Sequence, residues 1–152
     1  MIDRVTEYAK KTIDENKMGE LHILACKRHL EDLKRQGTKE FPYIWDPEKS
    51  ERILQYAETL TIGEGFEKKQ VKLPFGWLKL NGKRRFRRSY KSMARQNGKS
   101  FENGIKGTYI AGFSGYNYGK LFTVATKKRQ ARIAWEEMKK FIEADEDLQE
   151  LF

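Results

Sequence analysis

At 152 residues, the chain has the length of one ordinary domain or of a small domain with an appendage, and its net charge is +9. No apolar run of about 18 residues occurs, which excludes a membrane-spanning helix of ordinary length, and the single cysteine, Cys26, excludes an internal disulfide. Residues 1–4 lack the basic and apolar segments of a secretory signal. We therefore expect a strongly charged protein of a reducing compartment.

Three amphipathic helices are expected in the first 60 residues, because apolar side chains recur there three and four positions apart. The first covers residues 3–15 and the second residues 20–35. The third starts at Asp46 as N-cap, with Pro47 in the first helical position. The apolar stripes consist of Val5, Tyr8, Ala9 and Ile13; of Ile23, Cys26, Leu30 and Leu33; and of Ile53, Leu54, Ala57 and Leu60.

Glycines and prolines interrupt this helical pattern between residues 61 and 83 and mark a boundary. We expect a helical N-terminal subdomain at residues 1–62, a linker at 63–83, and the first part of a second domain at 84–152.

The second domain is predicted to be of the α/β class. Residues 84–92 alternate loosely and residues 121–125, LFTVA, form an apolar run, so both are expected to be strands. One helix follows Lys99, weakened by two glycines at roughly 1 kcal/mol each, and a second covers residues 128–143. This order of elements is typical of parallel strands with flanking helices. Trp77 and Trp135 are predicted to be core aromatics.

The tripeptide Gly98-Lys99-Ser100 has the residues that a phosphate-binding loop requires. A glycine lets backbone N–H groups close on phosphate oxygens, a lysine reaches the β and γ phosphates, and a hydroxyl holds magnesium. The helix expected to follow places its positive dipole end at the anion. The tripeptide alone is a weak signal, since it also occurs in ordinary surface turns.

The wider context carries a resemblance to a known family. Residues 94–100, ARQNGKS, resemble the deviant Walker A motif of terminase large subunits of tailed phages, which has lost its early glycine and carries an internal arginine. Residues 125–133, ATKKRQARI, are similar to that family's second strand running into its next helix. Further similar stretches are Gly76-Trp77, residues 84–90 (RRFRRSY), and the N-terminal helices with residues 41–43 (FPY).

The resemblance implies an N-terminal helical subdomain followed by the start of a P-loop NTPase-type parallel sheet. It implies ATP and Mg²⁺ as cofactors, with Lys99 at the β and γ phosphates, Ser100 at magnesium, and Arg95 as a phosphate sensor or cis arginine. The nucleotide-binding residues are then Ala94, Arg95, Gln96, Asn97, Gly98, Lys99 and Ser100. The implied partners are double-stranded DNA, the terminase small subunit, the portal protein and further copies of the chain, in the cytoplasm of a phage's host.

Two parts of the family pattern have no counterpart in the sequence. Family members carry a glutamine that contacts adenine between the positions of Pro74-Phe75 and Gly76-Trp77, and these pairs are adjacent here. After Val124, no apolar strand ends in the paired acids of a Walker B motif, and no nuclease carboxylates follow. We therefore expect a fragment or truncated form that binds nucleotide, with ATP hydrolysis, DNA translocation and concatemer cutting confined to the complete protein.

Residues 79–99 hold nine basic residues and no acidic one, which suits phosphate of a nucleotide or of a nucleic-acid backbone. The candidate DNA-binding residues are Arg84, Arg85, Arg87 and Arg88. A solvated basic face is the alternative explanation of the charge. The alternative function is a non-enzymatic, basic nucleic-acid-binding or interaction module in which the Gly-Lys-Ser tripeptide is incidental.

His22, Cys26 and His29 share one side of the second expected helix, and imidazole and thiolate both suit zinc. Because no further cysteine or histidine completes a closed four-ligand site, we assign no metal there. Cys26 is expected to be a buried structural thiol.

Overall fold

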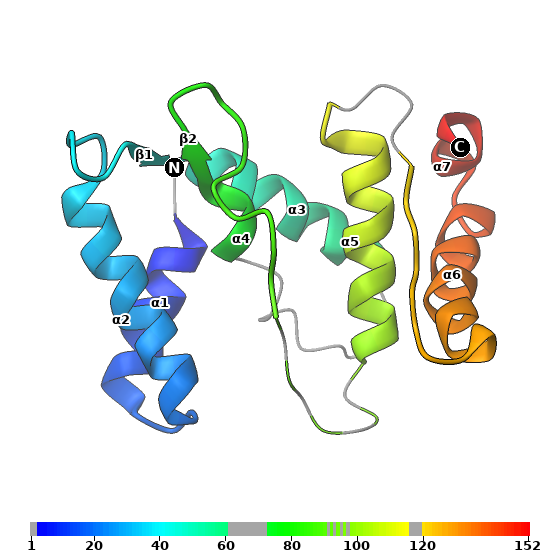
Figure 1. Cartoon of the computed structure of the whole chain (residues 1–152), viewed down its shortest axis with the longest axis horizontal. Helices are drawn as coiled ribbons and strands as arrows, with labels where there is room; N and C mark the ends of the chain where they lie inside the picture. The colour runs from blue at the N-terminus through cyan, green and yellow to red at the C-terminus, as the bar shows by residue number, and fades with distance from the viewer. Residues whose placement is uncertain are drawn as a thin grey trace. The chain divides into compact units, whose positions relative to one another are not determined.

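The computed structural model describes residues 3–60, 73–90, 92, 94, 96, 98–115 and 120–152. Backbone contacts divide the chain into two compact units, which are described separately (Figure 1). The first unit comprises Met1–Gln55 and Glu67–Tyr90, and the second comprises Tyr56–Phe66 and Lys91–Phe152.

The three expected N-terminal helices are confirmed. They are α1 (Arg4–Glu15), α2 (Glu20–Arg35) and α3 (Pro47–Leu60), with α1 and α2 packed as a helical hairpin (Figure 1). The side chain of Asp3 caps α1 by accepting the N–H groups of Val5 and Thr6. Asp46 accepts the N–H of Lys49 at 3.0 Å, as its expected N-cap role requires. These caps are local, which is why the sequence predicts the helix starts well.

A short antiparallel sheet completes the first unit. It pairs β1 (Tyr43–Trp45) with β2 (Trp77–Lys79), and the short helix α4 (Leu73–Gly76) leads directly into β2. Both α4 and β2 lie in the range expected to be a linker. Gly76 is there for packing, because a Cβ at this position would lie 2.4 Å from the Trp45 ring. The unit is centred on buried Val5, Phe41, Trp45, Leu54 and Trp77.

The second unit contains the helices α5 (Lys99–Phe113), α6 (Lys128–Glu143) and α7 (Glu146–Leu151). The expected helix at residues 128–143 is confirmed, as is the helix that follows Gly98. Contacts between α5 and α6 dominate the unit. Its core consists of Ala57, Ile105, Phe141 and Leu148, with Tyr56, Leu60 and Phe101 packed against them.

The glycines of α5 have a packing role that helix propensity does not reveal. A Cβ on Gly104 would lie 2.7 Å from the Phe141 ring, and one on Gly107 would lie 2.4 Å from the Met138 sulfur. Cβ atoms in proteins essentially never lie within 3.0 Å of such neighbouring atoms, so a side chain at either position would force the neighbour to shift. The glycines therefore let α6 approach α5 closely, which offsets their cost to the helix itself.

The expected parallel sheet does not occur among the described residues, where the sheet is the antiparallel β1–β2 pair. Residues 84–90 were predicted as strand and are not, apart from an isolated bridge between Arg84 and Leu78. Residues 121–125 are extended without strand pairing, and Phe122 and Val124 are 80% and 91% exposed. A run of arginines does not suit a sheet interior, and an apolar strand needs neighbouring strands to pair with.

The prediction for the two tryptophans is half right. Trp77 is 1% exposed and lies at the centre of the first unit, whereas Trp135 is 54% exposed on α6. Trp135 lies at the edge of the apolar stripe of α6, and the residues that pack against α5 are Met138 and Phe141.

Candidate nucleotide-binding site

Of the predicted phosphate-binding residues, the structure describes Ala94, Gln96 and residues 98–100, and α5 begins at Lys99. Gly98 is the N-cap residue and has left-handed backbone angles, with φ 69° and ψ 23°. Gln96 also has a positive φ, 62°, which is uncommon for a residue other than glycine. Lys99 and Ser100 are the first two helical residues, and Lys99 is exposed. Arg95 and Asn97 lie outside the described residues, so their predicted roles stay predictions.

The start of α5 has the electrostatics of an anion site. The first intrahelical bond runs from the Glu102 N–H to the Gly98 carbonyl at 2.9 Å, so the amides before Glu102 belong to the open end of the helix. The macrodipole makes this end positive, and the ammonium group of Lys99 adds a full charge. A left-handed residue before a helix also turns successive N–H groups toward one side. This arrangement favours phosphate.

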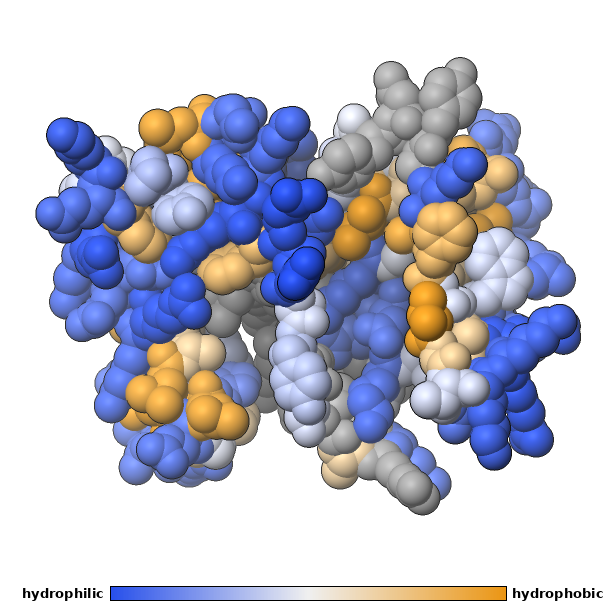
Figure 2. Space-filling model, viewed as in Figure 1, coloured by the Kyte–Doolittle hydropathy of each residue, from blue (hydrophilic) through white to orange (hydrophobic). Residues whose placement is uncertain are grey.

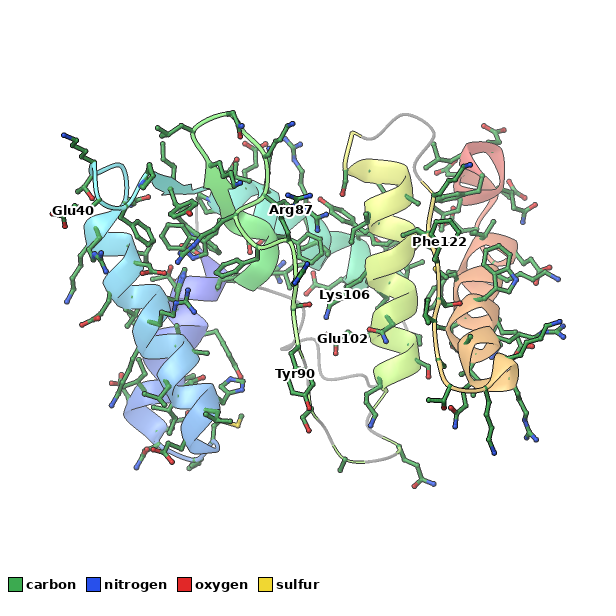
Figure 3. The ribbon with its side chains drawn as sticks, viewed as in Figure 1. Glu40, Arg87, Tyr90, Glu102, Lys106 and Phe122 are labelled. Carbon is green, nitrogen blue, oxygen red and sulfur yellow. The ribbon has the colours of Figure 1, made fainter. Side chains whose placement is uncertain are left out.

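Sequence reasoning overlooked a buried acid in the first turn of α5. The Glu102 side chain is only 2% exposed and forms an ion pair with Lys106, one turn further along the helix. Both side chains project from the same side of α5 (Figure 3). The signal in the sequence was the spacing of four between an acid and a lysine, which favours an ion pair on a helix. An anion bound at Lys99 would therefore lie near a carboxylate that Lys106 neutralises.

The basic run of residues 79–99 divides into buried and open parts. Arg85 is 11% exposed in its side chain, bonds the buried Asp32 at 2.6 Å, and lies over the rings of Phe41 and Tyr43 at 4.6 Å. Its charge is engaged inside the first unit and is not open to a DNA backbone. Arg87 and Arg88 are exposed and remain candidates.

The histidines of α2 serve the packing of the first unit. The His29 ring accepts a hydrogen bond from the indole N–H of Trp77 at 3.2 Å, and His22 bonds the Tyr8 hydroxyl at 3.0 Å. Cys26 is buried as expected, and burial raises the pKa of its thiol. Across the part of the chain that the structure describes, no group of three acidic, histidine or cysteine side chains is placed to hold a metal ion.

The comparison with protein families gives the assignment. A family model described as "Terminase large subunit, ATPase domain" matches residues 65–150, more than half of the chain, including the turn at Gly98 and both α5 and α6. This chain belongs to the terminase large subunit ATPase domain family. The resemblance expected from the sequence is thereby confirmed, and it connects the chain with DNA packaging and with ATP.

No curated protein and no solved structure matches this terminase chain significantly. None of the helices that the structure describes has the length and apolar character needed to cross a membrane.

Proposed function

We propose that residues 94–100 and the first turn of α5 are the ATP-binding loop of this terminase chain. The observation that carries the proposal is the backbone at Gly98, whose positive φ and N-cap position place Lys99 and Ser100 at the open end of a 15-residue helix. A phosphate-binding turn requires this geometry, since side chains at such a position block close approach of the anion.

The donor set of the turn fits a magnesium nucleotide. Lys99 contributes an ammonium group to the β and γ phosphates, Ser100 contributes a hydroxyl to magnesium, and the amides of the first turn hold phosphate oxygens. Arg95 stabilises charge on the outer phosphate as a sensor or cis arginine. Bound ATP with Mg²⁺ supplies the phosphoryl group whose transfer powers the motor. The chain's own residues bind and orient that group.

In the complete terminase, we propose, ATP hydrolysis drives translocation of double-stranded DNA and a nuclease cuts concatemers in the host cytoplasm. The small subunit, the portal protein and further copies of the chain are the proposed partners. Residues 121–125 then become a strand of a P-loop-type parallel sheet. The extended backbone of this segment and the exposure of Phe122 and Val124 support this role, because a buried strand of a parallel sheet would cover both side chains. Hydrophobic residues lie at the surface along the segment that precedes α6 (Figure 2).

Nucleotide titration followed by amide NMR tests the loop. Addition of pyrophosphate or of ATP with Mg²⁺ should shift the resonances of residues 95–101 before others. Gly98→Val and Lys99→Met should each weaken binding by tenfold or more, on the order of one lost charged hydrogen bond. Gly115→Val is the matched control, because Gly115 also has a positive φ, 72°, with nothing within 4 Å of its Cβ position. Binding that survives Gly98→Val, or that Gly115→Val weakens equally, would overturn the proposal.

A second candidate function is nucleic-acid binding by the first unit without nucleotide. Residues 86–90, which form neither helix nor strand, favour it. Arg87 and Arg88 are exposed, and the Tyr90 side chain (Figure 3) is 93% exposed. Cations beside an open aromatic ring suit a phosphate backbone and a stacked base. The two functions separate cleanly, because DNA binding by this segment should persist in Gly98→Val and fall in Arg87→Gln/Arg88→Gln.

A further inference from the structure

A stripe of exposed basic and aromatic side chains runs along α6. It consists of Lys128, Arg132, Trp135 and Lys139, spaced four, three and four residues apart, which places them on one side of the helix. The Arg132 and Lys139 side chains are 70% and 59% exposed, and Trp135 is 54% exposed. The opposite side of α6 packs against α5 through Met138 and Phe141. The stripe is therefore the open face of a helix whose other face is anchored.

Part of the basic charge of α6 lies at the end of the helix that disfavours it. Lys128, Arg129 and Arg132 follow the N-cap Lys127, and the first turn contains no acid. Cations at a helix N-terminus oppose the macrodipole and repel one another. In α2, by contrast, the basic residues Lys34 and Arg35 occupy the last turn, where the dipole favours them. Helix stability therefore accounts for Lys34 and Arg35 of α2 and does not account for Lys128 and Arg129 in the first turn of α6.

The segment that leads into α6 and the first turn of α6 carry only basic charge. No acidic residue occurs between Glu102 and Glu136, and four of the basic residues in that interval lie within residues 127–132. Arg132 pairs with Glu136 at 2.9 Å and Lys139 with Glu143 at 3.1 Å, along the helix. Exposed pairs of this kind contribute little stability and exchange readily for another anion. They hold the two long side chains along the stripe while leaving the guanidinium and ammonium groups accessible.

We infer that the α6 stripe, Lys128, Arg132, Trp135 and Lys139, binds a nucleic-acid strand. The charge complementarity of three cations in line suits successive phosphates, and the open indole suits either the sugar edge of a duplex or an unpaired base. This inference deepens the DNA-handling part of the proposed function and rests on it. The main nucleic-acid contact is then expected on the second unit rather than at residues 84–88, where Arg85 is buried.

The test measures binding of the full chain to a fluorescent duplex of about 25 base pairs and to a single strand of the same length, over a series of salt concentrations. Lys128→Gln/Arg132→Gln/Lys139→Gln should weaken duplex binding by about tenfold or more and reduce the salt slope by roughly three units, one per lost phosphate contact. The matched control, Lys10→Gln/Lys27→Gln/Lys34→Gln, removes three exposed charges from α1 and α2 and should change affinity by less than about threefold.

Trp135→Ala distinguishes the two forms of nucleic acid. A loss of affinity confined to the single strand indicates base stacking, and a similar loss of affinity for both forms indicates a backbone contact. Either result supports nucleic-acid binding by the α6 stripe. Equal losses in the α6 triple variant and its control, or no loss in the α6 variant, would overturn it. The inference would also be overturned if the chain bound phosphatidylglycerol vesicles through the α6 residues and bound neither nucleic acid. ATP titration of the α6 variant keeps the proposals separate, because nucleotide affinity should be unchanged there and lost in Gly98→Val.

Discussion

Each of the two compact units is stabilised internally by a different kind of interaction. In the first, buried polar groups and aromatic rings form a continuous chain of hydrogen bonds. The Trp77 indole donates to His29 Nδ1, which fixes the proton of the neutral ring on Nε2. Nε2 then donates to the Thr6 hydroxyl at 3.1 Å, and Thr6 donates to Asp3 at 2.5 Å. The Trp45 indole completes the chain by donating to the same Asp3 oxygen at 2.7 Å.

The second unit depends on shape instead. Its helices α5 and α6 approach each other over Gly104 and Gly107, and the facing side chains are Phe141 and Met138. Directional bonds tolerate little change in polarity or protonation. Close helix packing tolerates little added volume. We therefore expect acid and changes to polar side chains to destabilise the first unit, and added methyl groups to destabilise the second.

Asp32→Ala should have the largest effect, and it should fall on the first unit. Arg85 bonds Asp32 at 2.6 Å with both side chains nearly buried, so the change leaves a buried guanidinium without its carboxylate. The expected cost is about 3–5 kcal/mol. Urea unfolding followed by near-ultraviolet circular dichroism measures it, since Trp45 and Trp77 both lie in this core.

Arg28→Ala is the control for that change. Arg28 reaches the same Asp32 carboxylate at 3.7 Å, but its side chain is 63% exposed. We expect a cost below about 1 kcal/mol. Similar costs for the two substitutions would contradict the buried pair as the centre of this region.

Gly104→Ala should destabilise the second unit. Its Cβ would lie 2.7 Å from the Phe141 ring and 3.2 Å from the Glu137 Cβ, so α5 and α6 must separate. The overpacking should lower the free energy of unfolding by about 1–3 kcal/mol, which exceeds the gain of about 1 kcal/mol from the better helix propensity of alanine. Hydrogen exchange of the α5 and α6 amides is the measurement. Gly107→Ala should cost less, because its close neighbour is the end of the flexible Met138 side chain. A gain in protection for Gly104→Ala would show that propensity alone governs the site.

Mild acid should weaken the first unit through His29. Burial lowers the pKa of His29 against the opposing effect of Asp3 and Asp32, so the folded ring resists protonation that the unfolded chain accepts. Stability is then unaffected well above about pH 6.5 and falls below it, by up to about 1.4 kcal/mol per pH unit until the folded ring titrates. Urea midpoints between pH 7.5 and 5.5 should show this slope. His29→Gln should flatten it and His22→Gln should leave it in place; a slope that persists in His29→Gln would place the proton elsewhere.

The helices were predictable from the sequence because their signals are local. Asp46 and Pro47 mark the start of α3 within a few residues, and the apolar stripes need only their own periodicity. The β1–β2 pairing was not predictable in this way. It joins residues 43–45 to residues 77–79, across a stretch rich in glycine and proline that suggests a linker. Its strands are also too short to show alternation.

In the candidate site, too, the local features were predictable from the sequence and the long-range packing was not. Gly98-Lys99-Ser100 and the start of α5 follow from residue types and spacing, and the structure has a helix beginning where the tripeptide requires it. The burial of Glu102 and Arg85 did not follow, because it depends on side chains remote in sequence, such as Asp32 for Arg85. Charged residues in a sequence suggest surface, and only packing shows which of them are inside.

The smallest effect is expected for Trp135→Phe, which tests whether the second unit keeps this ring outside its core. Because Trp135 is 54% exposed, the change should alter stability by no more than about 0.5 kcal/mol. Trp77→Phe is the control and removes the indole donor to His29, which should cost about 1–3 kcal/mol. Fluorescence gives an independent readout, since Trp135 should be the tryptophan that acrylamide quenches readily while Trp45 and Trp77 are protected. Trp135→Phe should therefore shift the remaining emission to the blue and reduce quenching. Unchanged quenching, together with a stability loss as large as that of Trp77→Phe, would mean that the ring is packed, and the open face of α6 would lose its aromatic member.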